Sequence, residues 1–134
     1  MPVLGMNFNE INGKKEDKRP NQEVKVNSTP VITEVREIEV SNIKKKVLAI
    51  DFDFISKYEP DYAKINIKGS LMYLTENNKK AIDEFKKNNK LPDNMSLEVL
   101  NYLFRHCLLK SAVLADDLQL PPPMPMPRIT PKKE

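Results

Sequence analysis

The segment Val47–Leu74, VLAIDFDFISKYEPDYAKINIKGSLMYL, determines how the rest of the chain must fold. Apolar and polar residues alternate in both of its halves. The apolar residues that share one side are Leu48, Ile50, Phe52 and Phe54 in the first half and Ile65, Ile67, Leu71 and Tyr73 in the second. Successive side chains of a strand point to opposite faces, so this pattern predicts two strands with one buried face each. The turn contains Pro60, which has no N–H for a strand ladder. Two strands alone are marginally stable in water, so other segments must cover their apolar face.

Further strands are expected before this hairpin. The segment Glu23–Asn27 alternates between polar and apolar residues, and Val31–Val40 is rich in β-branched residues. The apolar positions of the second segment do not keep one register, which indicates a β-bulge or partial burial. Short connections favour antiparallel neighbours, so we expect an antiparallel sheet of three or four strands.

Two helices are expected after the hairpin, the first from an N-cap at Thr75 to residue 88 or 89 and the second from Asp93 or Ser96 to about Asp116. The second helix has a wide apolar band, formed by Val99, Leu100, Leu103, Phe104, Cys107, Leu108 and Val113. So wide a band predicts a second contact besides the sheet, with the Pro-rich end or with another subunit. The predicted fold class is therefore α+β, with an antiparallel sheet packed by two C-terminal helices.

The two ends differ from the middle in composition. Residues 1–22 are expected to form an extended N-terminal arm whose first eight residues can dock on the body through Leu4, Met6 and Phe8. Residues 23–120 are expected to form a single α+β domain, and residues 121–134 a Pro-rich C-terminal tail. Six of the eleven prolines follow Leu120. The tail also carries apolar residues that Pro-rich linkers usually lack, so we favour a strap over the second helix. The alternative is a ligand for an aromatic groove of a partner.

The distribution of charge limits the classes of partner. The net charge is +3, and residues 31–120 carry equal numbers of acidic and basic side chains. A dedicated nucleic-acid-binding protein usually has a basic stripe on its body, whereas the excess here lies in the two ends. No apolar run reaches the length of a membrane span, and a single cysteine fits a reducing, cytoplasmic location.

No group of residues predicts catalysis, a metal or a cofactor. Asp51 and Asp53 share one face of a strand, and we interpret them as surface residues near Lys64 and Lys68 of the neighbouring strand. His106 and Cys107 are adjacent on a helix and point about 100° apart, so they do not converge on one ion. We therefore predict that the protein is not an enzyme.

The order of elements resembles the SecB-like family, whose founding member is an export chaperone that holds unfolded preproteins. Leu103-Phe104 resembles the Leu-Phe pair in the long helix of that family, and Leu120-Pro121 resembles its apolar-Pro step. The chain departs from the family where Arg105 replaces a proline and Leu118 replaces a glycine, and it is not acidic. The resemblance implies a chaperone that binds unfolded or export-bound polypeptides, or a protein partner, as a homo-oligomer.

Two functional hypotheses result. The first is polypeptide binding by exposed apolar side chains, for which the candidates are Phe52, Phe54, Leu103, Phe104, Met124 and Met126. The second is association with the ribosome or another RNA through basic ends, for which the candidates are Lys14, Lys15, Lys18, Arg19, Arg128, Lys132 and Lys133.

Overall fold

The computed structural model describes residues 3–18, 21, 23–41 and 44–124. Within these residues the elements are β1 (Val3–Lys15), β2 (Lys25–Val40), β3 (Lys45–Glu59), β4 (Ala63–Tyr73), α1 (Asn78–Asn88) and α2 (Asp93–Asp117). The strands form one antiparallel sheet in the order β1-β4-β3-β2. This confirms the predicted α+β fold.

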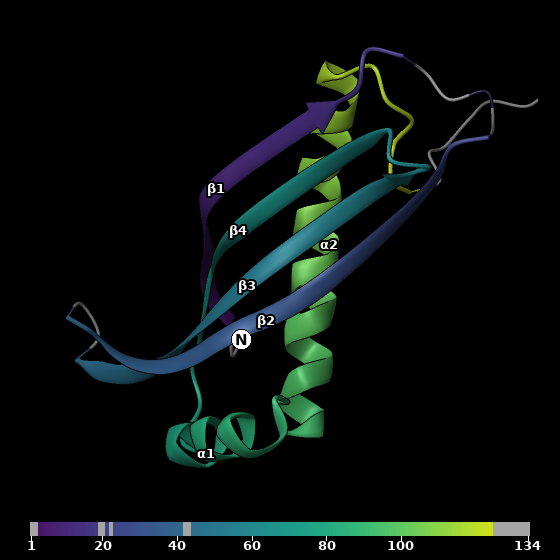
Figure 1. The fold of residues 1–134 in the computed structure, drawn as a ribbon. Coiled ribbons are helices and arrows are strands. Elements are labelled where there is room, and N and C mark those ends of the chain that lie inside the picture. The colour runs from purple at the N-terminus through teal and green to yellow at the C-terminus, as the bar shows by residue number, and fades with distance from the viewer. Residues whose placement is uncertain (1–2, 19–20, 22, 42–43, 125–134) are drawn as a thin grey trace, which may run out of the picture.

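The long helix α2 lies across one face of the sheet, and α1 lies near one end of α2 (Figure 1). In the part of the chain that the structure describes, no helix covers the opposite face, which we call the open face (Figure 1). The central strand β3 shows why the sheet has two different faces. Leu48, Ile50 and Phe52 are at most 2% exposed on the helix side, whereas Asp51 and Asp53 lie on the open face.

The structure differs from the prediction of an arm over residues 1–22. Residues 3–15 form the edge strand β1, which pairs with β4 from Val3 opposite Tyr73 to Lys15 opposite Ala63. Met6 and Phe8 of β1 pack against the core. The sheet therefore begins at Val3 rather than at residue 23.

The two segments expected as separate strands before the hairpin form one strand, β2. Pro30 lies within it, opposite Phe54 of β3. This is compatible with a strand because β2 lies at the edge of the sheet, where a missing N–H need not break a ladder. The predicted bulge is confirmed, between Ile32 and Glu34.

Gly69 of β4 lets β1 approach closely. A Cβ atom at this position would lie 2.1 Å from the backbone oxygen of Asn7. The register of β1 shifts between Phe8 and Glu10, next to this contact. No other residue type fits here without a shift of β1, because the obstacle is backbone rather than a flexible side chain.

The helix α1 begins two residues later than predicted. Thr75 is not its N-cap, because its hydroxyl accepts a hydrogen bond from the backbone N–H of Asn77, 3.2 Å away, and the helix begins at Asn78. The buried side chain of Asn78 donates to Glu37 of β2 at 3.0 Å and to the carbonyl of Lys46 at 3.1 Å. These bonds attach α1 to the end of the β2–β3 hairpin.

The helix α2 buries every fourth residue along most of its length: Met95, Val99, Leu103, Cys107, Ser111 and Ala115. Four residues of an α-helix turn through about 400°, so the buried line shifts by about 40° at each step. Antiparallel sheets are twisted, and a straight helix across a twisted sheet presents a different side to it at each level. The two ends of α2 therefore bury different sides.

Contacts from the sheet also hold the segment after α2. The Nζ atom of Lys15 donates to the carbonyl of Leu118 at 2.6 Å, and the hydroxyl of Tyr58 donates to the carbonyl of Pro121. Leu120 is buried. Residues 125–134, which include most of the predicted strap, lie outside the described residues, and the strap stays a prediction.

Two tyrosines of the sheet form hydrogen bonds with α2 or with the segment after it, and both have a raised pKa. Burial raises the pKa of Tyr58 to about 12. The pKa of Tyr73 is raised to about 12 by burial and by the hydrogen bond that its hydroxyl donates to Glu98 of α2, at 2.8 Å. Both contacts need the neutral phenol.

Replacing Leu103 by Ala should destabilise the fold by about 2–5 kcal/mol, because this side chain is fully buried and its loss leaves a cavity. Leu97→Ala on the same helix is the matched control, since Leu97 is 67% exposed. Its free energy of unfolding should stay within about 0.5 kcal/mol of the original. Urea unfolding followed by circular dichroism measures both, and equal losses would contradict the assigned face of α2.

The stability of the protein should fall as the pH rises from about 10 to about 12. The unfolded chain loses the phenol protons near pH 10, whereas folded Tyr58 keeps its proton until about pH 12, so alkaline pH favours unfolding. Tyr58→Phe removes this group. The urea midpoint of the variant should therefore decrease less steeply over this range than that of the original protein, and parallel decreases would contradict the assignment.

Candidate functional site

A groove with mainly apolar walls lies between the edge strand β1 and the helix α2. Its volume is about 390 Å³, and its lining residues are Met6, Phe8, Tyr102, His106, Leu109, Lys110 and Val113. Met6 and Phe8 lie opposite Leu71 and Gly69 of β4, on the helix side of the sheet. We call this feature the β1–α2 groove.

The shifting buried line of α2 explains why apolar residues remain uncovered here. Leu109 and Val113 are each 55% exposed. At this level of the helix, the sheet contacts the side that carries Cys107 and Ser111, so the side that carries Leu109 and Val113 faces solvent. Exposed apolar side chains that cluster together are typical of an interaction surface.

Aromatic contacts give the groove defined walls. The rings of Tyr102 and His106 lie 4.3 Å apart at an angle of 34°. Phe8 packs edge-to-face against Phe52 of the core, with ring centroids 6.4 Å apart. These contacts restrict the conformations of the side chains that a ligand would touch.

A second, smaller apolar flank lies on the other side of α2. Leu97 is 67% exposed and Phe104 is 37% exposed. The ring of Phe104 packs edge-to-face on Phe54, at 5.5 Å. Phe104 and Leu109 are five residues apart and therefore point about 140° apart around the helix. The two apolar flanks are thus separate surfaces.

The structure distributes the predicted polypeptide-binding residues between core and surface. Phe52, Phe54 and Leu103 belong to the core and are at most 2% exposed, so a ligand on the folded chain cannot reach them. Phe104 lies on the second flank and Met124 is half-buried. Met126 lies outside the described residues.

The β1–α2 groove was not predicted from the sequence. Its wall on α2 includes Val113, which was part of the predicted apolar band. Its other wall was missed because residues 3–15 were expected to form an arm. The apolar residues Met6 and Phe8 indicated that the start of the arm contacts the body, and both do pack against the core, but as part of a strand.

The predicted RNA-binding residues do not form one site in the described part of the chain. Lys14 and Lys15 are neighbours on β1, and Lys15 is engaged with the carbonyl of Leu118. Lys18 is exposed beyond the end of β1. The other four candidates, Arg19, Arg128, Lys132 and Lys133, lie outside the described residues.

The described residues contain no group of three or more His, Cys, Asp or Glu side chains that would hold a metal ion. Cys107 is fully buried, and burial raises the pKa of its thiol to about 12. At neutral pH this thiol is protonated and is not a nucleophile. Asp51 binds Arg36 in an ion pair of 3.2 Å, rather than the lysines of β4 that we expected, and Asp53 lies opposite Lys68.

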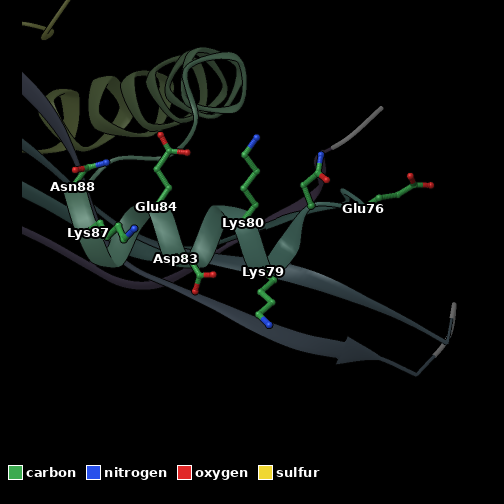
Figure 2. A pocket seen from close by; sticks show the side chains of 8 residues that line it. Glu76, Lys79, Lys80, Asp83, Glu84, Lys87 and Asn88 are labelled. Carbon is green, nitrogen blue, oxygen red and sulfur yellow. The ribbon is translucent and has the colours of Figure 1, made fainter.

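A larger hollow of about 580 Å³ lies along α1. Figure 2 shows its lining side chains, with Lys79 and Asp83 directed away from Lys80 and Glu84. They come from one short helix and the residues before it, and they are mostly charged. Because the side chains diverge into solvent, they do not form a convergent binding site.

Comparison with known proteins adds one match. A scan against models of protein families gave none, and a search of curated proteins gave none. Among solved structures, the chain matches the Mycobacterium tuberculosis SecB-like chaperone Rv1957, in complex with a ChAD peptide from the Rv1956 HigA1 antitoxin. The TM-score is 0.53, with 98% of this chain and 91% of that chain covered. The chain has a SecB-like fold.

The SecB-like fold is shared at 11% sequence identity, so the match concerns the arrangement of the elements and not their side chains. It agrees with the resemblance inferred from the order of strands and helices. Among the described residues, no helix is both long enough and apolar enough to cross a membrane.

Proposed function

We propose that this SecB-like protein is a non-enzymatic chaperone of the cytoplasm, and that it binds extended segments of unfolded polypeptide in the β1–α2 groove. The observation that carries the proposal is the cluster of Leu109 and Val113, each 55% exposed, beside Met6 and Phe8. A folded protein has no structural need to expose these side chains together.

The dimensions of the groove suit a short extended segment. Its residues on α2 extend from Tyr102 to Val113, which corresponds to about 16 Å along the helix axis. An extended chain advances about 3.3 Å per residue, so about five residues fit along the groove. A segment of this length is available in an unfolded chain and is mostly hidden in a folded one.

The chemistry of the walls suits many sequences. Apolar burial is not directional, so it does not require one ligand sequence. Met6 is flexible and polarizable, which allows it to adapt to side chains of different shape. Lys110 and His106 at the groove add polar groups for the backbone of a bound segment. The bound peptide of the solved SecB-like structure supports a polypeptide as the class of ligand.

A second copy of the chain is the competing occupant of the exposed side of α2. The homo-oligomer implied by the family resemblance stays a prediction. Association with RNA through the ends is less supported, because Lys14 and Lys15 belong to the sheet and Lys15 has a partner.

The proposal predicts that the double variant Leu109→Ser, Val113→Ser suppresses aggregation of a chemically unfolded client several-fold less well than the original protein. Light scattering after dilution of the client from denaturant measures the effect. Leu97→Ser is the matched control, because it removes an exposed leucine from the opposite flank of α2 and should retain activity.

Two further measurements separate the outcomes. Circular dichroism checks that the variants are folded, which is expected because both residues are exposed. Light-scattering mass shows whether the double variant changes the oligomeric state. An unchanged activity of the double variant, or an original protein that does not suppress aggregation, would contradict the proposal.

A further inference from the structure

Opposite charges form ion pairs at two places on the open face of the sheet. Arg36 of β2 binds Asp51 of β3 at 3.2 Å. Lys68 of β4 lies opposite Glu10 of β1 and Asp53 of β3, and its Nζ atom is 3.8 Å from Glu10. Such cross-strand pairs stabilise a sheet.

One row of the open face carries like charges on three neighbouring strands. Lys64 of β4 lies directly opposite Lys14 of β1 on one side and opposite Lys57 of β3 on the other. All three side chains are exposed. Like charges in this position repel one another and destabilise a sheet. We call Lys14, Lys57 and Lys64 the lysine row.

No ion pair within the described part of the chain neutralises the lysine row, since the pairs found there are Arg36–Asp51 and Lys68–Glu10. Neighbouring strands lie about 4.8 Å apart, so three strands place the lysines across about 10 Å. Glu16, Glu59 and Asp61 line a hollow together with the three lysines, but none of them forms an ion pair with the row. Stability alone does not explain like charges placed directly opposite one another.

A second observation lies beside the row. A hollow of about 260 Å³ is lined by Lys14, Lys64 and Lys68, by Asn12 and Asn66, and by Glu10. The Oδ1 atom of Asn66 is buried and has no hydrogen-bond partner. The three lysines and the amide NH₂ groups of Asn12 and Asn66 outnumber the single carboxylate of Glu10 among the lining groups. The hollow is therefore rich in donors.

We propose that the lysine row and this hollow bind an acidic segment of a polypeptide partner, through two or three Asp or Glu carboxylates. Side chains on one side of an extended chain recur about every 6.7 Å, so two carboxylates fit within the width of the row. Lysine and amide donors match carboxylate oxygens, and charge-assisted hydrogen bonds of this kind are strong.

The surroundings favour a short acidic segment over a nucleic acid. Glu10 and Asp53 flank the row on one side along the strands, and Glu59 and Asp61 lie on the other. A long phosphate backbone that ran along the strands would meet these carboxylates. Single-stranded nucleic acids also stack on exposed aromatic rings, whereas the nearby Tyr58 and Tyr62 are buried.

The lysine row is separate from the β1–α2 groove, because the two lie on opposite faces of the sheet. On strand β1, Met6 faces the helix side and Lys14 faces the open side. The proposal therefore does not depend on the proposed function of the groove.

Binding of a fluorescent peptide with alternating Glu and Gly tests the proposal, measured by anisotropy at low ionic strength. The double variant Lys57→Gln, Lys64→Gln should bind at least tenfold more weakly. The control Lys79→Gln, Lys87→Gln removes the same charge from exposed positions of α1 and should stay within twofold of the original. A peptide with Gln in place of Glu should not bind.

Three results would overturn the proposal. Equal weakening by both double variants would show that only net charge matters. If the acidic peptide did not bind the original protein, the row would not be a binding site. An RNA oligonucleotide that binds more tightly than the acidic peptide, with the same dependence on Lys57 and Lys64, would assign the row to nucleic acid.

The repulsion among the three lysines of the row is tested by a separate variant. Lys64→Glu places an acidic side chain between Lys14 and Lys57 and should raise the urea midpoint, while it abolishes binding of the acidic peptide. A lower midpoint would show that the row is not repulsive in the folded protein, and would contradict the reason for inferring a ligand.

Discussion

The packing of one straight helix across a twisted four-stranded sheet is the constraint on which the other features depend. It selects every fourth residue of α2 for burial, from Met95 to Ala115. It also determines which apolar residues of α2 stay exposed to solvent, because the line of contact with the sheet moves around the helix. Leu97 and Phe104 remain on one flank, and Leu109 and Val113 remain on the other. The candidate site is thus a geometric consequence of how the core is made.

Elements with a strong local pattern were predictable from the sequence. The β3–β4 hairpin has a strict alternation over both strands, and α2 has apolar residues at helical spacing, so each was predicted close to its observed bounds. The bulge in β2 was also predictable, because a one-residue slip moves every later side chain to the other face. These predictions depend only on residues that are close together in the sequence.

Features that depend on distant partners were not predictable. Strand β1 has two glycines and a polar second half, and its partner β4 follows about 50 residues later, so nothing near it in the sequence marks it as a strand. The β1–α2 groove needs the position of β1 and was therefore missed with it. The wide apolar band of α2 was interpreted as evidence of a second contact, with the Pro-rich end or another subunit. Part of its width has another cause, because the buried side of the helix changes along its length. Phe52 and Phe54 were predicted to bind a ligand because their strand has one apolar face, but α2 covers that face.

The pairing of β1 with β4 also has a consequence for how the protein is made. Val3 is synthesised before its partner Tyr73, which follows 70 positions later. Contacts of such sequence separation form late, because a long loop must close before they are gained. Until then Met6 and Phe8 have no neighbours, while β2, β3 and β4 pair through short turns. The edge of the sheet that carries one wall of the groove therefore forms only after β4 has been made, and the groove is complete only when α2 has also packed on the sheet.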